Sequence, residues 1–573
     1  GRFSRIRERE VCWTSALRPE PDDTHMKYTT LLLTAVLVSL PLHANSNGVI
    51  GGPLVDSLEN IDISTSPDGI VLLPSTVHPK ITDVFERYTK ILADDGTPIH
   101  FLVHKGVGNP KIVHARRIME QHLSDVPGSL YGSDKAIVRV NMGIRRATMI
   151  FFPDEDAFEN GPPAVDDFMD AYEAPMQDLL GDEIILAGSS NYTSNFNPRR
   201  DASYEELLHL AHGYGINKGM PALKLAIEQA ATNAVNKGWY TPPPGLPKVD
   251  IPFEYFAFTM ETWYGIWRHD PNNGEYVFST RAQMEAGDPL IVAILEGFAP
   301  KYHVHRATLV PKFAGTFLTE DTAGIEYTYK SRYLTDVEIG GGKNNNVEGN
   351  DQPGFITGNT GDNRLEGRGG PDRIDGNAGT DTAVYRGPRN EYGLYLMDGN
   401  VTVDDSQASR DACDHVTTTE WLEFTDQSVA TSSLTDAANH YCNSTINSTG
   451  VMATINVIGS PAVMHQDLTL LASQMPLYQF GYFLASQTAG FVSGPGGSQG
   501  DLCLGGKIAR FSKDLRNAGT TGSFSLDVDM MNIPANPAVA IIPGETWHFV
   551  AWFRDKNPNP TSNFTGGVLV LFQ

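Results

Sequence analysis

The sequence predicts a multidomain protein: an α+β N-terminal domain, then a short parallel β-roll with a β-strand cap, then a C-terminal antiparallel β-sandwich. Three observations support this fold class. The chain has 573 residues, more than one hydrophobic core usually serves. A nine-residue repeat rich in Gly, Asn and Asp runs through its middle. Mixed helical and strand patterns precede the repeat, whereas short strand-like segments separated by turn residues follow it.

The composition limits the class of partner. With 40% hydrophobic and 19% charged residues, the chain has the composition of a globular protein. Its formal net charge of −25 argues against nucleic acid or an anionic membrane as the main partner, because phosphate groups are bound by clustered Lys and Arg. The charge favours divalent cations and suits an extracellular protein.

Residues 1–44 are expected to be an upstream segment followed by a signal peptide that starts at Met26. The sequence KYTTLLLTAVLVSLPLHANS after Met26 combines a lysine, a short apolar run and a small-residue cleavage site at Ala44. We therefore expect a secreted or cell-surface protein whose mature chain begins at Asn45. The apolar run is too short to span a bilayer comfortably, so no stable membrane span is expected.

The strongest signal lies between Ile339 and Ala383, where the sequence repeats every nine residues. Glycine starts each of five units, Asn, Gly or Asp fills the sixth position, and an aliphatic residue fills the eighth. Glycine allows the left-handed conformations of a tight turn, and a sixth-position carboxylate points into the turn toward a cation. The eighth-position side chains are expected in a thin core between short parallel strands. These side chains are Val347, Ile356, Leu365, Ile374 and Ala383.

This repeat resembles the RTX, or haemolysin-type, calcium-binding nonapeptide GGxGxDxUx. The resemblance implies a β-roll over residues 337–385 that holds Ca²⁺ between its turns, with Asp372 and Asp381 as ligands and Asn363 as a weaker oxygen donor. At the sixth position of the second unit, Gly354 offers only its backbone carbonyl. Since successive turns alternate between two sides, Asn363 and Asp381 are expected on one side and Asp372 on the other. The alternative interpretation is a flexible linker rich in Gly and Asn.

Three further segments follow the repeat. Residues 386–438 alternate aromatic or β-branched residues with polar ones, as antiparallel strands do, and resemble the cap module of serralysin-like secreted proteins. Residues 439–450 are predicted to be a polar linker, and residues 451–573 a β-sandwich.

Cysteine spacing leaves the disulfide pairing open. A bridge between Cys413 and Cys442, which would leave Cys503 unpaired, is one arrangement.

Before the repeat, residues 45–77 are predicted to be a linker and residues 78–336 an α+β domain. Helical spacing appears in ITDVFERYTKIL, NPKIVHARRIMEQHL and PALKLAIEQAATNAVNKG, whereas TPIHFLVHKG and RATMIFFPDE are short apolar runs typical of strands. The last of the three helices is expected to begin at Pro221 and end at Gly238.

The candidate chemistry of this domain lies in SYEELLHLAHGYG, residues 203–215. On a helix, Glu205, His209 and His212 form one stripe, with Glu206 on its flank. The pattern is that of HExxH, the two-histidine zinc motif, except that a glutamate replaces the first histidine. Gly213 and Gly215 are expected to end the helix.

A further ligand is offered by Glu254 in FEYFAFTMETWYGIW, which is predicted to be a helix with Glu254 and Glu261 on one face. The arrangement resembles the gluzincin metallopeptidases, especially the lethal-factor-like group. That resemblance implies Glu206 as general base, with His209 and Glu254 as metal ligands and Glu205 or His212 completing the set. The metal is expected to be Zn²⁺ or another divalent transition metal, since two carboxylates and one imidazole also suit iron or manganese.

Two functions remain open at this level. The first is a secreted calcium-binding RTX-repeat protein whose N-terminal domain is a metal-dependent, peptidase-like hydrolase acting on protein or peptide. The second is a non-catalytic adhesion or surface-binding protein with a calcium-stabilised β-roll, whose first domain is a peptidase-like fold turned to binding a cell-surface ligand. A purely structural role for the helix within residues 203–215 also stays open. Loss of the first histidine favours the second function, and the spacing of Glu206, His209 and Glu254 favours the first.

Overall fold

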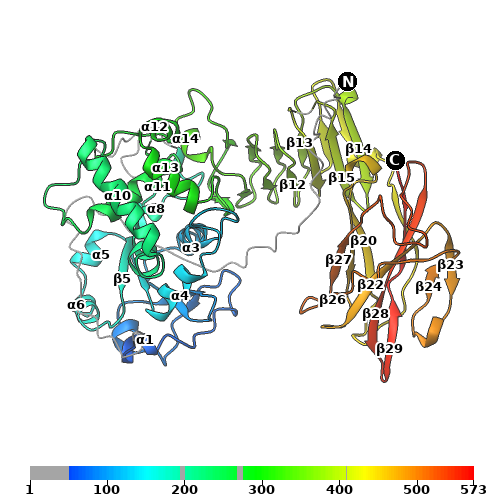
Figure 1. Cartoon of the computed structure of the whole chain (residues 1–573), viewed down its shortest axis with the longest axis horizontal. Coiled ribbons are helices and arrows are strands. Elements are labelled where there is room, and N and C mark those ends of the chain that lie inside the picture. The colour runs from blue at the N-terminus through cyan, green and yellow to red at the C-terminus, as the bar shows by residue number, and fades with distance from the viewer. Residues whose placement is uncertain (1–50, 194–199, 268–274, 408) are drawn as a thin grey trace. The chain divides into compact units, whose positions relative to one another are not determined.

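The computed structural model describes residues 51–193, 200–267, 275–407 and 409–573 (Figure 1). They form two compact units that meet in sequence between Gly341 and Gly342. The first unit combines helices with a sheet and the second is rich in strands, which confirms a multidomain chain with mixed α and β content. The expected signal peptide lies outside the described residues. In the described part of the chain, no helix has the length and apolarity needed to cross a membrane.

A five-stranded sheet with the order β1-β2-β3-β4-β5 forms the centre of the first unit. Strands β1 to β3 pair antiparallel, and β3, β4 and β5 pair parallel. Every side chain of β4 is buried, as expected of a strand that is covered on both faces. The strands are β1 (Val71–Leu72), β2 (Arg87–Leu92), β3 (Pro98–Val103), β4 (Thr148–Phe152) and β5 (Met176–Leu180).

Two sequence expectations differ from this sheet. Residues 81–92, expected to be helical, form only the end of helix α2 (Pro79–Thr82) and then strand β2, because pairing along β3 from Arg87 to Leu92 overrides the helical spacing. Residues 51–77 of the expected linker contain α1 (Pro53–Asp56) and the buried residues Leu54, Val55, Leu58 and Ile61, which share a core with Phe85. This segment therefore belongs to the folded unit.

Helix α8 (Ser203–Ala211) packs against α3 (Asn109–Leu123), α11 (Ile251–Trp263) and strand β5. Apolar residues of α3, α8, α10 (Pro221–Lys237) and α11 form one large core with the sheet. As expected, α10 begins at Pro221 and ends at Gly238, whose φ of 68° is left-handed. The unit also contains α4 (Ala136–Ile144), α5 (Glu155–Glu159), α6 (Pro163–Met169), α7 (Ser190–Thr193), α9 (Asn217–Gly219), α12 (Arg281–Gly287), α13 (Pro289–Phe298), α14 (Thr328–Ser331), β6 (Ala307–Leu309), β7 (Thr316–Leu318) and β8 (Val337–Ile339).

The nine-residue repeat forms three-residue strands that stack in two parallel sets. Strands β9, β11 and β13 pair in one set, β10 and β12 in the other, and each step between paired residues is 18 positions. All five eighth-position side chains are at most 3% exposed, so they form the thin core that the spacing predicts. The strands are β9 (Asn346–Glu348), β10 (Phe355–Thr357), β11 (Arg364–Glu366), β12 (Arg373–Asp375) and β13 (Thr382–Val384).

The strands after the repeat add to both sets. Strand β16 pairs parallel with β12, and β17 pairs parallel with β13. Antiparallel neighbours then flank them, β14 and β15 beside β16 and β18 beside β17. Their bounds are β14 (Tyr392–Met397), β15 (Asn400–Asp405), β16 (Cys413–Thr417), β17 (Trp421–Glu423) and β18 (Ser428–Ala430).

The C-terminal region consists of antiparallel strands in separate sheets that share one hydrophobic core. A seven-stranded sheet contains β19, β30, β28, β22 and β25, with β26 on β22 and β29 on β28; β20, β21 and β27 form a three-stranded sheet, and β23 pairs with β24. The bounds are β19 (Ala438–Cys442), β20 (Thr454–Gly459), β21 (Leu468–Ser473), β22 (Phe480–Ser486), β23 (Ala489–Val492), β24 (Leu502–Leu504), β25 (Ala509–Arg510), β26 (Arg516–Asn517), β27 (Phe524–Asp527), β28 (Thr546–Lys556), β29 (Pro560–Phe564) and β30 (Gly567–Leu571).

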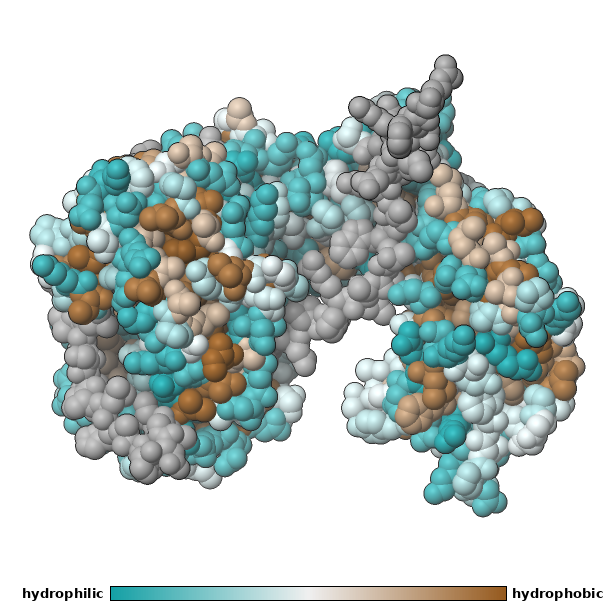
Figure 2. Space-filling view, in the orientation of Figure 1, coloured by the Kyte–Doolittle hydropathy of each residue, from teal (hydrophilic) through white to brown (hydrophobic). Residues whose placement is uncertain are grey.

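The expected linker at residues 439–450 differs in the structure, because its first residues belong to β19, which pairs with β30. Cys442 at the end of β19 forms a disulfide with Cys503, whose Cα lies 6.2 Å away, and not with Cys413. Strand pairing and the disulfide therefore attach this segment to the C-terminal region. On the face shown in Figure 2, polar and hydrophobic residues are interspersed over the surface of each unit.

Candidate metal sites

Helices α8 and α11 bring three candidate ligands to one point. Glu205 and His209 of α8 and Glu254 of α11 each offer one ligand atom, and these atoms lie within 4.8 Å of one another. Glu205 is 3% exposed, and the other two are half-buried. One imidazole and two carboxylates at this spacing suit a divalent transition metal.

The ring of His209 is oriented by Glu206. Its Nδ1 lies 2.9 Å from Oε2 of Glu206, which also accepts a 2.7 Å hydrogen bond from Nε2 of Gln177 on β5. In the tautomer in which Nδ1 donates to the carboxylate, Nε2 carries the lone pair. That Nε2 is buried without a hydrogen-bond partner and lies 3.8 Å from Oε1 of Glu254. The histidine therefore aims an unused ligand atom into the cluster.

Arg200 supplies a positive charge beside the same cluster. Its Nη2 pairs with Glu205, its Nε lies 2.9 Å from Oε2 of Glu261 on α11, and its guanidinium stacks 4.4 Å from the ring centroid of Trp267. Glu261, expected on the same helical face as Glu254, thus binds Arg200 and does not join the cluster. Glu205 has a cationic partner in this structure, and a metal ion would have to share it or displace it.

Carboxyl groups are concentrated around the cluster, and burial raises the pKa of several. Burial, followed by the negative charges of Asp178, Glu183 and Glu254, raises the pKa of Glu206 well above its ordinary value. Burial raises the pKa of Asp178 to about 6. Burial and the charge of Glu254 raise the pKa of Glu275 to about 7. Such a concentration of buried acids stabilises any cation that enters it.

The remaining predicted residues of this helix lie differently. His212 stays outside the cluster: its ring stacks on Phe253 with centroids 4.2 Å apart, and burial lowers its pKa to about 3. Gly213 and Gly215 do not end the helix, because the backbone continues as a π-helix, His212–Ile216. A Cβ on Gly215 would lie 2.5 Å from Val138, so close packing against α4 explains that glycine. Sequence spacing gave no sign of Arg200, Gln177, Asp178 or Glu275, which come from other elements.

In the repeat, the sixth-position side chains point, as expected, into the coils, which are the successive turn-and-strand units of nine residues. The Asp381 side chain is fully buried; its Oδ1 accepts a 2.8 Å hydrogen bond from the backbone N–H of Asn363, and its Oδ2 has no hydrogen-bond partner. On the other side, Oδ1 of Asp372 accepts a 2.8 Å hydrogen bond from the N–H of Gly354. Asn363 and Asp381 thus occupy neighbouring coils of one set, with Asp372 in the other.

Asn363 uses its side chain for internal hydrogen bonds. Its Oδ1 accepts from the N–H of Asn359, and its Nδ2 donates to the carbonyl of Asn345, each at 2.8 Å. One lone pair of Oδ1 is therefore already engaged. Asn363 as a calcium ligand stays a prediction.

The first-position glycines make room for these side chains. A Cβ on Gly376 would lie 2.7 Å from Oδ2 of Asp381 and 2.3 Å from the carbonyl oxygen of Thr418. A Cβ on Gly358 would lie 2.6 Å from Oδ1 of Asn363. Each turn is therefore lined by oxygen atoms that pack against the Cα of a glycine. Oxygen is the type of donor that Ca²⁺ prefers.

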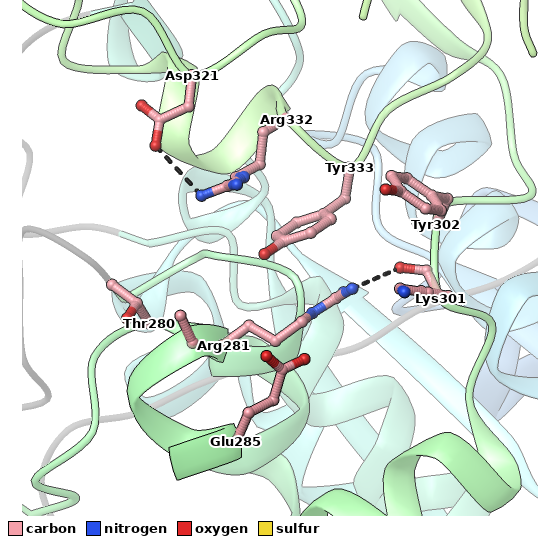
Figure 3. Close-up of a pocket in the computed structure, with 9 residues that line it drawn as sticks. Thr280, Arg281, Glu285, Lys301, Tyr302, Asp321, Arg332 and Tyr333 are labelled. Atoms are coloured by element: carbon pink, nitrogen blue, oxygen red, sulfur yellow. Dashed lines mark hydrogen bonds and ion pairs between the residues drawn. The ribbon is translucent and has the colours of Figure 1, made fainter. Parts of the chain in front are cut away.

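A separate surface cavity of about 440 Å³ in the first unit is shown in Figure 3. Arg281 lines it, with Nη1 donating to the carbonyl of Lys301 and its guanidinium 3.7 Å from the ring centroid of Tyr333. Arg332 pairs with Asp321 at 3.3 Å. The lining contains no member of the Glu205–His209–Glu254 cluster.

No family model matches the chain, and no curated protein matches it. Among solved structures, a local similarity relates it to the crystal structure of extracellular lipase LipA from Serratia marcescens, at 18% identity and a TM-score of 0.09. The match covers 15% of this chain and 15% of that one, so the chain spans a small part of the lipase's length. A similarity of this size carries no argument about fold or function.

Proposed function

We propose that this protein is a secreted, calcium-binding RTX-repeat protein in which Ca²⁺ stabilises a parallel β-roll. The observation that carries the proposal is the side chain of Asp381, which is fully buried and keeps Oδ2 without a hydrogen-bond partner in a glycine-lined turn. A buried carboxylate is costly unless a proton or a cation neutralises it. Hard oxygen donors spaced by the coil repeat favour Ca²⁺.

In this proposal Asp372 and Asp381 are the principal side-chain ligands, and Asn363 is a weaker one. Ca²⁺ binds the folded coils and not the unfolded chain, so it adds to the stability of the second unit. The roll, its cap and the following β-sandwich are the architecture that the strand pairings favour.

The test is a calcium titration of the full chain, followed by thermal unfolding and circular dichroism. The wild type is expected to gain about 2.7 kcal/mol when free calcium reaches one hundred times its dissociation constant. Asp372→Ala and Asp381→Ala are expected to reduce this gain. A wild type that shows the same unfolding curve in calcium and in chelator would contradict the proposal that Ca²⁺ stabilises the roll.

A second function is favoured by one specific observation, the unused Nε2 of His209 between Glu205 and Glu254. We infer that the first unit holds Zn²⁺ or another divalent transition metal at these three residues and is a peptidase-like hydrolase. Such a metal, when bound, polarises a substrate carbonyl or activates water. Glu206 orients His209 through Nδ1, as carboxylates beside metal-bound histidines commonly do. Its role as general base, implied by the gluzincin resemblance, remains a prediction.

The alternative is a non-catalytic surface-binding protein. The pairing of Arg200 with Glu205 favours it, because the guanidinium already neutralises one of the proposed ligands. Metal analysis of the purified chain separates the alternatives: a stoichiometric transition metal that is lost in His209→Ala supports the metal centre. Peptide hydrolysis lost in Glu206→Gln supports catalysis, whereas a metal-free wild type without hydrolysis supports the binding protein.

A further inference from the structure

Two strands outside the nonapeptides continue the coils in exact register. Ile374 of the last complete coil on one side pairs with Val416 of β16, and Ala383 on the other side pairs with Leu422 of β17. Val416 and Leu422 are at most 1% exposed, like the aliphatic residues of the repeat. They therefore occupy the eighth position of two further coils, although the nine-residue spacing has ended.

Counting back two residues places an acid at the sixth position of each added coil. These acids are Asp414 before Val416 and Glu420 before Leu422. Neither belongs to the repeat pattern, since they are separated by six residues and no glycine starts their units. The sequence repeat alone would therefore not assign them to the calcium array.

Backbone hydrogen bonds place both acids in the same role as the repeat ligands. Within the repeat, the sixth-position N–H donates to the sixth-position carboxylate of the next coil on its side, as from Asn363 to Asp381. The N–H of Asp381 donates in the same way to Oε2 of Glu420 at 2.8 Å, and that of Asp372 donates to Oδ1 of Asp414 at 2.9 Å. The pattern persists while the sequence separation grows from 18 residues to 39 and 42.

An unused ligand atom lies between the last two coils of one side. Oδ2 of the fully buried Asp381 has no hydrogen-bond partner and faces the Cα of Gly376, beside which the carbonyl oxygen of Thr418 also lies. Glu420, held by the N–H of Asp381, adds a second carboxylate there. Two carboxylates and a carbonyl in one turn repel one another unless a cation joins them.

We infer that the calcium array extends one coil beyond the nonapeptides on each side, with Glu420 completing a site with Asp381 and Asp414 completing a site with Asp372. The inference rests on the proposed calcium-binding function and adds two ligands to it. All the donors are oxygens, which selects Ca²⁺ over softer transition metals. These sites also join the repeat to the strands that close its end, so calcium would stabilise that junction.

The experiment is equilibrium dialysis of the full chain against calcium, which gives the number of bound ions and their dissociation constants. Glu420→Gln and Asp414→Asn are each expected to lose one ion or to weaken its binding about tenfold or more. Glu423→Gln is the matched control. Glu420 directly precedes strand β17 and Glu423 ends it, but the carboxylate of Glu423 pairs with Arg364 and not with a backbone N–H of a coil. The binding curve of this control is expected to match the wild type.

Three outcomes separate the inference from the proposed function. Loss of one ion in Glu420→Gln with an unchanged Glu423→Gln supports the inference. Calcium binding that Asp381→Ala weakens but Glu420→Gln and Asp414→Asn leave at wild-type values overturns the inference and leaves the proposed function intact. A wild type that binds no calcium overturns both. If Glu420→Gln fails to fold, Glu420→Ala takes its place, and a wild-type ion count and dissociation constant there contradict the inference.

Discussion

The backbone N–H of Asn363 lies 2.8 Å from Oδ1 of Asp381, so one coil of the repeat holds the carboxylate of the next. This hydrogen bond fixes one oxygen of the carboxylate and leaves Oδ2 facing the glycine-lined turn. The two residues occupy the same repeat position, but their side chains make different interactions. Asp381 offers a free ligand atom, whereas the amide of Asn363 is engaged with Asn359 and Asn345.

Substitutions at these two positions should therefore differ in their calcium dependence. Asp381→Asn is expected to abolish most of the calcium-induced rise in unfolding free energy, because it removes the ligand charge. Asn363→Ala is expected to lower the calcium-free unfolding free energy by about 1–3 kcal/mol, because it leaves buried backbone groups without partners. Unfolding of both variants, with calcium and with chelator, measures the two effects. Equal calcium responses in both variants would contradict this division of roles.

Gly376→Ala is expected to destabilise the second unit by about 1–3 kcal/mol and to weaken calcium binding. The added Cβ would lie 2.3 Å from the carbonyl oxygen of Thr418 and 2.7 Å from Oδ2 of Asp381, too close for any carbon atom. Chemical denaturation and calcium titration measure the two effects. Thr380→Ala, an exposed position of the same turn, serves as the control and is expected to leave both quantities unchanged.

The parts of the fold that follow from local periodicity were predictable from the sequence. The nine-residue spacing places the same residue types at the same point of each coil, and the burial of Val347, Ile356, Leu365, Ile374 and Ala383 follows it. Helix α10 likewise begins and ends at the proline and glycine that favour those positions. Residues 81–92 were wrongly expected to be helical, since pairing with β3 is a long-range interaction that local spacing does not contain.

The candidate metal cluster was predictable only in part, for the same reason. Glu205 and His209 are one helical turn apart, so their proximity is local, and Glu254 was found through the downstream helix. Arg200 reaches Glu205 and Glu261 through tertiary packing, and nothing in the residue spacing indicates it. The coil positions of Asp414 and Glu420 are likewise set by strand pairing after the regular spacing has ended.

His209 and His212 are expected to differ in their effect on bound metal. His209→Ala should lose the transition metal, because it removes the buried Nε2 that faces Glu254. His212→Ala should keep the metal and lower the unfolding free energy, because its ring packs against Phe253 and Phe256. Metal content by elemental analysis and denaturation curves check both statements. Metal loss in His212→Ala would show that this histidine, and not the three-residue cluster alone, holds the ion.

Lys135 should make the stability of the first unit depend on alkaline pH. Its side chain is fully buried, with Nζ donating to the carbonyl of His122 and 4.0 Å from the ring centroid of Phe298. Burial lowers its pKa from 10.5 to about 7 in the folded protein. Between these values the unfolded chain binds more protons than the folded one, so the unfolding free energy rises with pH, by up to about 1.4 kcal/mol per unit.

Lys135→Met is expected to flatten this rise between pH 7 and pH 10, and urea denaturation across that range measures it. Lys237→Met, which removes an exposed lysine at the end of α10, is the matched control and should keep the wild-type slope. A wild type and Lys135→Met variant with the same slope would mean that Lys135 stays protonated in the folded state.

Arg200 should have opposite effects on stability and on metal affinity. Its guanidinium pairs with the buried carboxylates of Glu205 and Glu261, so Arg200→Met leaves two buried negative charges without their partner. In chelator the variant is expected to lose about 3–5 kcal/mol of unfolding free energy. Because the guanidinium and a metal ion compete for Glu205, the same variant is expected to bind Zn²⁺ or Mn²⁺ more tightly than the wild type, and metal should restore much of its stability.

Arg200→Lys keeps the charge but not the paired geometry. Its stability and metal affinity are expected to lie between those of the wild type and Arg200→Met. Metal titration and denaturation of the three proteins decide the point: a variant that loses stability but shows wild-type metal affinity would mean that Arg200 only stabilises the fold and does not compete with the ion.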